Sequence, residues 1–131
     1  ALRKDYLPTY AALVEVVVAA GTEMSATARE LADEVLTREA TDRQLTESER
    51  LLLLRALVAL ATRAKLGRGA GRVRERVVGA VLDAEARDVE GAAGLLAELA
   101  ASSVIPARLR KRLAARLEAS AKAQAHRAQG A

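Results

Sequence analysis

The sequence contains no cysteine, phenylalanine or tryptophan, and Tyr6 and Tyr10 are its only aromatic residues. Without cysteine the chain has no disulfide framework, no thiol nucleophile and no cysteine-ligated zinc, and this composition favours a cytoplasmic location. The core must consist of leucine, valine and alanine. The scarcity of aromatic rings also argues against the stacking of single-stranded bases.

Residues that commonly carry catalysis are scarce as well. His126 is the one histidine, and it lies in a polar segment without a neighbouring acid. Ser102 and Ser103 have no base beside them. The glycines of 67–71 lack the preceding strand and the Gly-Lys-Ser/Thr ending of a phosphate-binding loop. We therefore expect no catalytic residue and no cofactor, and predict that the chain is not an enzyme.

The abundant residues are those that favour helices. Alanine, leucine, arginine and glutamate rank high in helix propensity, whereas β-branched residues occur in two short runs. At 131 residues the chain has the length of one domain. These features predict an all-α, compact single-domain bundle of about six helices over 1–118, followed by a flexible or frayed basic tail over 119–131.

Two apolar runs dominate the pattern, 11–20 and 51–61. A charged residue interrupts each run, Glu15 in the first and Arg55 in the second. Both runs are shorter than the roughly 20 residues that span a bilayer, so we expect no membrane anchor. We predict that 11–20 forms a buried helix covered by neighbours on every face, and that 51–61 lies at the centre of the bundle.

Several residues predict where helices begin. We expect Ser25 to cap the second helix, Asp88 to cap the fifth, and Thr46 with Glu49 to form a capping box at the third. The segment 68–72, Arg-Gly-Ala-Gly-Arg, is predicted to be a flexible basic connector.

A weak internal repeat relates 17–26 to 98–107. Each segment combines the end of an apolar helix, a short loop with an apolar plug (Met24 or Ile105), and the start of a charged helix. Two pseudo-symmetric halves would explain the similarity. Chance similarity between alanine-rich segments is the alternative.

The first of these repeated segments resembles a known family. Residues 16–30, Val-Val-Val-Ala-Ala-Gly-Thr-Glu-Met-Ser-Ala-Thr-Ala-Arg-Glu, are similar to the loop between the first helices of the TerB-like family, named from tellurite resistance. That family is an all-helical bundle with a second such loop near its C-terminal end, so the resemblance covers most of 7–118. It implies an acidic patch that binds a divalent metal, to which Glu23 and Glu30 would contribute.

Other positions depart from the family pattern. Gly21 and Thr22 replace the acid and the glycine of the first loop, and Ser102 and Ser103 occupy the corresponding places of the second. A hard cation needs several oxygen ligands, so two carboxylates alone make a poor cage. A denser acidic group follows at Asp83, Glu85, Asp88 and Glu90. Capping and solvation explain it, and contact with a cation or with the basic tail of another subunit is the alternative.

Two functions follow from these features. The first is a non-catalytic, TerB-like interaction or scaffold module in a stress-response or defence assembly, binding a protein partner or a second copy of itself. The alternative is a nucleic-acid-associated protein that binds the phosphate backbone through 63–76 and 108–116. The net charge is +4. The residues that would contact phosphate are Arg68, Arg72, Arg108, Arg110, Lys111 and Arg112.

Overall fold

A computed structural model describes the backbone of residues 6–130 and the side chains of 7–127. Within this range there are six α-helices, one 3-10 turn and no strand, so the predicted all-α bundle of about six helices is confirmed. Residues 1–5 of the predicted domain and residue 131 of the predicted tail lie outside the described residues. The elements are α1 (Tyr6–Ala20), η1 (Gly21–Met24), α2 (Ser25–Thr41), α3 (Glu47–Arg63), α4 (Ala70–Ala86), α5 (Ala92–Ala101) and α6 (Ala107–Gly130).

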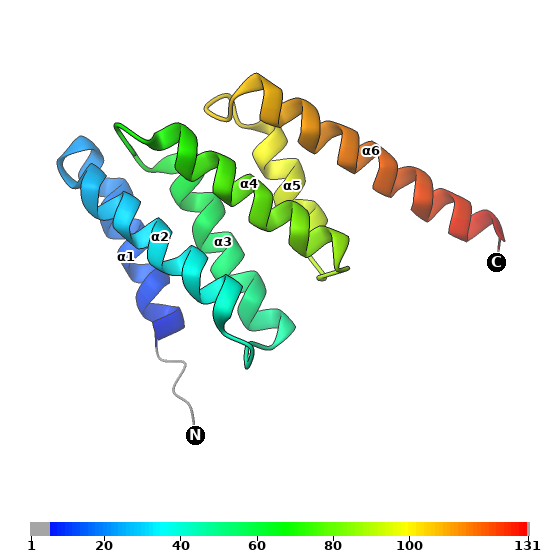
Figure 1. The fold of residues 1–131 in the computed structure, drawn as a ribbon, viewed down its shortest axis with the longest axis horizontal. Helices are drawn as coiled ribbons and strands as arrows, with labels where there is room; N and C mark the ends of the chain where they lie inside the picture. The colour runs from blue at the N-terminus through cyan, green and yellow to red at the C-terminus, as the bar shows by residue number, and fades with distance from the viewer. Residues whose placement is uncertain (1–5, 131) are drawn as a thin grey trace.

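The helices form two layers. Consecutive helices pair as three hairpins, α1–α2, α3–α4 and α5–α6, so that α2, α4 and α6 make one layer over α1, α3 and α5 (Figure 1). Among the described residues, each α-helix contacts only its neighbours and next-but-one neighbours along the chain. This is the contact pattern of stacked helix pairs, in which each unit touches only the units beside it.

The internal repeat corresponds to two of these hairpins. Its aligned segments run from the end of α1 into α2 and from the end of α5 into α6. Ile105 is fully buried between the helices of its hairpin, and Met24 is half-buried at the equivalent place. The stack contains three helix pairs, and the repeat relates the first to the third, so the chain does not divide into two halves.

The helix α3 occupies the centre, as predicted. It contacts α1, α2, α4 and α5, and Leu53, Leu54, Leu57 and Leu60 along it are at most 1% exposed. Full burial of each such side chain stabilises the fold by roughly 1.5–3 kcal/mol. These leucines hold the three hairpins together.

The prediction for α1 is wrong, because this helix lies at the edge of the stack. It contacts only α2, α3 and η1 within the described part of the chain. Val14 and Val17 are buried, but Leu13 and Val16 on the other side are 40% and 52% exposed. The valine run is thus helical, and only one of its faces is covered.

The helix ends confirm one capping prediction and overturn two. Thr46 and Glu49 form the capping box, in which the Glu49 N–H donates to Thr46 Oγ1 (3.1 Å) and the Thr46 N–H donates to Glu49 Oε1 (2.8 Å). Ser25 does not cap α2, because the 3-10 turn leads directly into the helix and Met24 takes the N-cap position without a side-chain bond. Asp88 does not cap α5 either. It lies just after α4 in the left-handed conformation (φ 60°), and Gly91 precedes α5.

Two boundaries also differ from the prediction. The connector between α3 and α4 lies earlier in the chain than expected, at 64–69 instead of 68–72, because α3 ends at Arg63 and α4 begins at Ala70. It is anchored by Leu66, whose carbonyl accepts a hydrogen bond from Arg29 (2.6 Å). The helix α6 continues to Gly130 instead of ending near Ser120, so the segment predicted to be a flexible or frayed tail is helical up to that residue. Alternate alanines give this segment high helix propensity, and Figure 1 shows it projecting past α5.

Ion pairs join neighbouring helices in the α2–α4–α6 layer. In each pair the acid belongs to the earlier helix, and the arginine belongs to the later helix or to the residue that ends it. Glu39 and Glu85 are the buried acids among the described residues, and each lies near the end of its helix. The pairs are Asp33–Arg76 (2.6 Å), Glu39–Arg87 (3.9 Å), Glu75–Arg108 (3.0 Å) and Glu85–Arg116 (2.8 Å).

The capping box gives the first prediction. Replacing Thr46→Ala removes the acceptor for the Glu49 N–H, and we expect the free energy of unfolding to fall by about 1 kcal/mol. Ser25→Ala is the matched control, because this hydroxyl caps nothing, and its effect should stay within about 0.5 kcal/mol. Urea unfolding followed by circular dichroism measures both. Equal losses for the two variants would contradict the assignment of the helix starts.

Candidate protein-interaction surface

One side of α3 remains open between α1 and α5. We call this surface the α3 groove, and it consists of three hollows of about 260, 490 and 330 Å³. The hollow beside α1 is lined by Ala11, Val14, Glu15, Leu52, Arg55, Ala56 and Ala59. The two beside α5 are lined by Arg55, Ala59, Thr62, Arg63, Leu95 and Glu98, and by Glu47, Ser48, Leu51, Arg55, Glu90 and Gly91.

The sequence of α3 explains the shape of the groove. Leu52, Arg55, Ala59 and Thr62 recur at intervals of three and four residues, so they lie along one face of the helix. The small side chain of Ala59 leaves space beside α1 and α5. Leu52 is 49% exposed, an unusual position for leucine in the most buried helix of the chain. The groove therefore offers apolar surface to a partner.

Gly91 shapes the hollow at the start of α3. Its φ of +90° lies in the left-handed region, and a Cβ at this position would lie 2.9 Å from Cδ2 of Leu51. Glycine thus lets the α4–α5 connection approach α3 closely. On the same rim, the backbone N–H of Glu90 donates to Glu47 Oε1 (2.6 Å). This bond links the α4–α5 connection to the first turn of α3.

Arg55 is the central charge of the groove. It lines all three hollows, its side chain is exposed, and it makes no hydrogen bond or ion pair with any described residue. Its neighbour Arg63 differs, because Arg63 Nη1 and Nη2 donate to Glu15 Oε1 (3.1 Å) and Oε2 (3.0 Å). The hydrogen bond with Glu15 raises the pKa of Arg63. Glu15, Glu47, Glu90 and Glu98 also line these hollows, but none of them bonds Arg55. Its guanidinium is therefore available to the carboxylate of a partner.

The two residues predicted to hold a metal lie on different elements. Glu23 lies on η1 and Glu30 on α2, both exposed. Glu30 lines a hollow with Glu34 between α1 and α2, but Glu23 does not line it. Among the described residues, no group of three or more His, Cys, Asp or Glu side chains is placed to hold a metal ion.

Two of the acidic residues of 83–90 form ion pairs within the fold. Asp83 pairs with Arg87 (2.6 Å), and both oxygens of Glu85 accept from Arg116 Nε (2.8 Å). That hydrogen bond raises the pKa of Arg116. Glu85, Asp88 and Glu90 nevertheless line one hollow, together with Ser120, Gln124 and Arg127 of α6. They are not placed to hold a metal ion.

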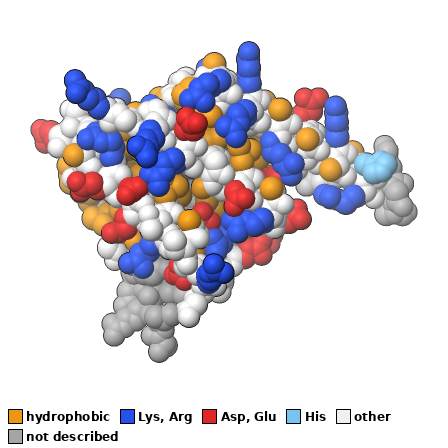
Figure 2. Space-filling view, in the orientation of Figure 1, with side chains coloured by type: hydrophobic (Ala, Val, Ile, Leu, Met, Phe, Trp, Pro, Cys, Tyr) orange, Lys and Arg blue, Asp and Glu red, His pale blue; other side chains and the backbone are white. Residues whose placement is uncertain are grey.

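The residues predicted to contact phosphate gather at one end of the α4–α6 layer. Arg68 and Arg72 flank the start of α4, and the other four occupy the first turns of α6. Arg108 pairs with Glu75, and Arg110 Nε donates to the Ile105 carbonyl (2.9 Å). The other bases are exposed and have no partner among the described residues. Figure 2 shows lysines and arginines on this face, with acids between them.

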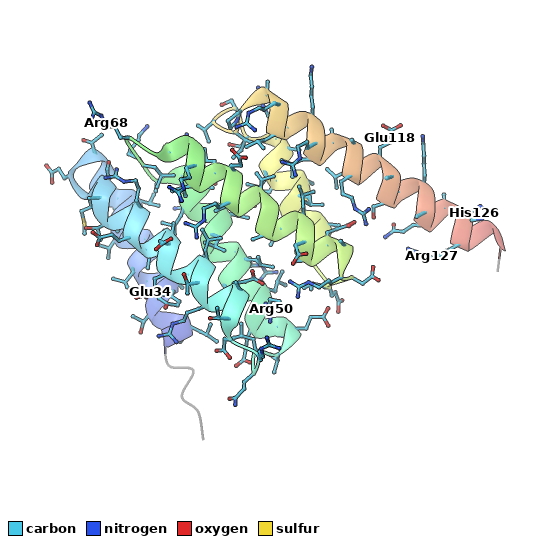
Figure 3. The ribbon with its side chains drawn as sticks, in the orientation of Figure 1. Glu34, Arg50, Arg68, Glu118, His126 and Arg127 are labelled. Atoms are coloured by element: carbon cyan, nitrogen blue, oxygen red, sulfur yellow. The ribbon has the colours of Figure 1, made fainter. Side chains whose placement is uncertain are left out.

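The remaining reactive residues are isolated. His126 is exposed near the end of α6, away from the bundle (Figure 3). Ser102 and Ser103 lie in the α5–α6 loop. No histidine lines any of the hollows of the α3 groove.

The N-terminal part of the chain is apolar enough to cross a membrane by composition and length alone. An 18-residue window within Leu7–Thr41 has a mean hydropathy of 1.3, and 17% of it is buried. The helix itself is interrupted by the 3-10 turn at Gly21–Met24. At 1.5 Å per residue, α1 is about 22 Å long, shorter than the roughly 30 Å hydrocarbon core.

Comparisons with known protein families, curated proteins and solved structures find no match. The resemblance to TerB-like domains therefore stays a prediction. The α3 groove was not predicted from the sequence. Its one signal was Arg55, the single charge inside the apolar run 51–61, whose spacing from Leu52 and Ala59 marks an exposed stripe.

Proposed function

We propose that this protein is a non-catalytic interaction module that binds another polypeptide in the α3 groove. The observation that carries the proposal is Arg55, which lacks a partner among the described residues at the point where three hollows meet. Interfaces concentrate their binding energy in central arginines and large apolar groups surrounded by less important contacts. Arg55 with the half-exposed Leu52 provides that combination.

The architecture supports the same function. Stacked helix pairs present extended surfaces, and proteins built in this way commonly use them to bind partners. An amphipathic helix laid into an apolar groove is a recurring mode of recognition. By its resemblance to TerB-like domains, the module would belong to a stress-response or defence assembly.

A photo-crosslinking amino acid placed in the groove tests the proposal. We expect a photoreactive residue at position 59 to cross-link to a polypeptide in cell extract, since Ala59 lines two of the hollows. The same residue at position 79 is the control, because Gly79 is exposed on α4 with nothing within 4 Å of its Cβ position. Mass spectrometry identifies the cross-linked chain.

Two matched variants test whether that cross-link depends on the apolar surface of the groove. Leu52→Glu should abolish it, because the variant replaces the exposed apolar side chain of the groove with a charge next to Arg55. The stability should change by about 0.5 kcal/mol, because the site is surface-exposed. Leu13→Glu, at a leucine of similar exposure outside the groove, should leave it unchanged. Cross-links that survive Leu52→Glu, or that appear equally at position 79, would refute the proposal.

The second candidate is binding to a nucleic-acid backbone at the α4–α6 end, favoured by the four exposed and uncommitted bases Arg68, Arg72, Lys111 and Arg112. At about 50 mM salt, fluorescence anisotropy should detect binding of duplex DNA or RNA that weakens steeply as salt rises. Lys111→Ala with Arg112→Ala should reduce the salt slope by about two. Arg43→Ala, in the turn at the opposite end, should not change it. The absence of binding at low salt would exclude this function.

A further inference from the structure

The helix α6 carries a charged face that no described part of the chain covers. Lys111, Glu118 and Lys122 are seven and four residues apart, so they lie on one side of the helix, and all three are exposed. The buried side of α6, marked by Leu109 and Leu113, faces the other way. In Figure 3 the labelled Glu118 points away from the bundle.

Small side chains accompany the charges of this face. Ala114 and Ala115 lie between Lys111 and Glu118, Ala125 follows Lys122, and all three alanines are exposed. Small side chains let another helix or groove approach the backbone closely. Glu118 has one partner, Lys122 at 3.4 Å, and the two side chains are 71% and 76% exposed. An ion pair so exposed contributes little and is readily exchanged for another.

The charges of the α3 groove alternate with signs opposite to those of the α6 face. Arg55 lies at the centre, with Glu47 towards the start of α3 and Glu98 in the hollow beside α5. Glu47 precedes Arg55 by eight residues, about 12 Å along the helix, and Lys111 precedes Glu118 by seven, about 10 Å. Glu15 and Arg63, which also line the groove, neutralise each other as an ion pair. The remaining negative–positive–negative order of the groove therefore matches the positive–negative–positive helix in sign, and the first two charges match in spacing.

We infer that the occupant of the α3 groove is α6 of a second copy of this chain, with Glu118 of that copy paired to Arg55. Lys111 then lies near Glu47, and Lys122 lies near Glu98. The alanines of α6 pack against Leu52 and Ala59. This inference rests on the proposed function of the groove and names its partner.

The directions of the helices allow the contact to be reciprocal. The matched charges require α6 of one copy to run parallel to α3 of the other. Within one molecule α3 and α6 run in opposite directions (Figure 1). A two-fold axis perpendicular to both helices reverses the direction of each. It therefore lays each α6 parallel to the α3 of the other copy and closes a dimer with two equal contacts.

Charge reversal in sedimentation equilibrium tests the inference. The unmodified protein should self-associate reversibly at low ionic strength. Arg55→Glu and Glu118→Arg should each weaken association about tenfold or more, because each places like charges at both contacts. Arg43→Glu changes the net charge as Arg55→Glu does, lies outside the groove, and should associate like the unmodified protein. Circular dichroism verifies that every variant is folded.

Rescue is the decisive part of the experiment. An equimolar mixture of the Arg55→Glu and Glu118→Arg variants pairs opposite charges at both contacts, so it should recover association. The doubly substituted chain should recover it as well. A purely structural effect of either substitution would not be rescued. A monomeric unmodified protein at every concentration, or a mixture that stays as weak as its components, overturns the inference.

The outcome is separable from that of the proposed function. If the unmodified protein is monomeric but position 59 cross-links to a different polypeptide in a Leu52-dependent way, the groove is a binding site and the second copy is the wrong occupant. If position 59 cross-links to nothing, the proposed function fails as well. Cross-links between two copies of the chain, joining position 59 to α6, support both.

Discussion

The burial of one side of α3 is the interaction on which the rest of the structure depends. Its leucines are enclosed by α1, α2, α4 and α5, and no single hairpin in the chain could cover them alone. Because the chain has no phenylalanine or tryptophan, this burial relies on close contact between leucine, valine and alanine. Side chains of this size fill the core only if the helices lie close together. Four helices that surround α3 at this distance form the two layers.

The same stacking decides which surfaces remain available. The helix at the middle of a layer contacts two helices in its own layer and two in the other layer. The part of its surface that faces away from the other layer remains exposed to solvent. In α3 this exposed surface carries Leu52 and Arg55. In the other layer, arginine–acid ion pairs join α2 to α4 and α4 to α6. The interaction surface and the ion-paired layer thus both follow from the stacking of the helices. The proposed docking uses the exposed face of α6, which is the outermost helix of the ion-paired layer.

The sequence predicts the helices well because their signals are local. Helix propensity and the capping box at Thr46 act within a few residues, and both predictions are confirmed. The exposed side of α1, the conformation of Asp88 and the length of α6 depend on which helix lies beside which, and periodicity does not determine this order. The same holds for the α3 groove. Arg55 is an interruption of an apolar run in the sequence, and it becomes a site only when α1 and α5 flank it.

The reactivity of single introduced cysteines measures the solvent exposure of the two sides of α3 directly, because the chain has no cysteine of its own. Single Leu52→Cys and Leu53→Cys variants place a thiol on adjacent residues, one 49% and the other 1% exposed. In the folded, dilute protein the variant at position 52 should react with a thiol reagent nearly as fast as the unfolded chain, whereas the variant at position 53 should react only through unfolding. Equal protection at both positions would show that α3 is enclosed on all sides and would contradict the open groove.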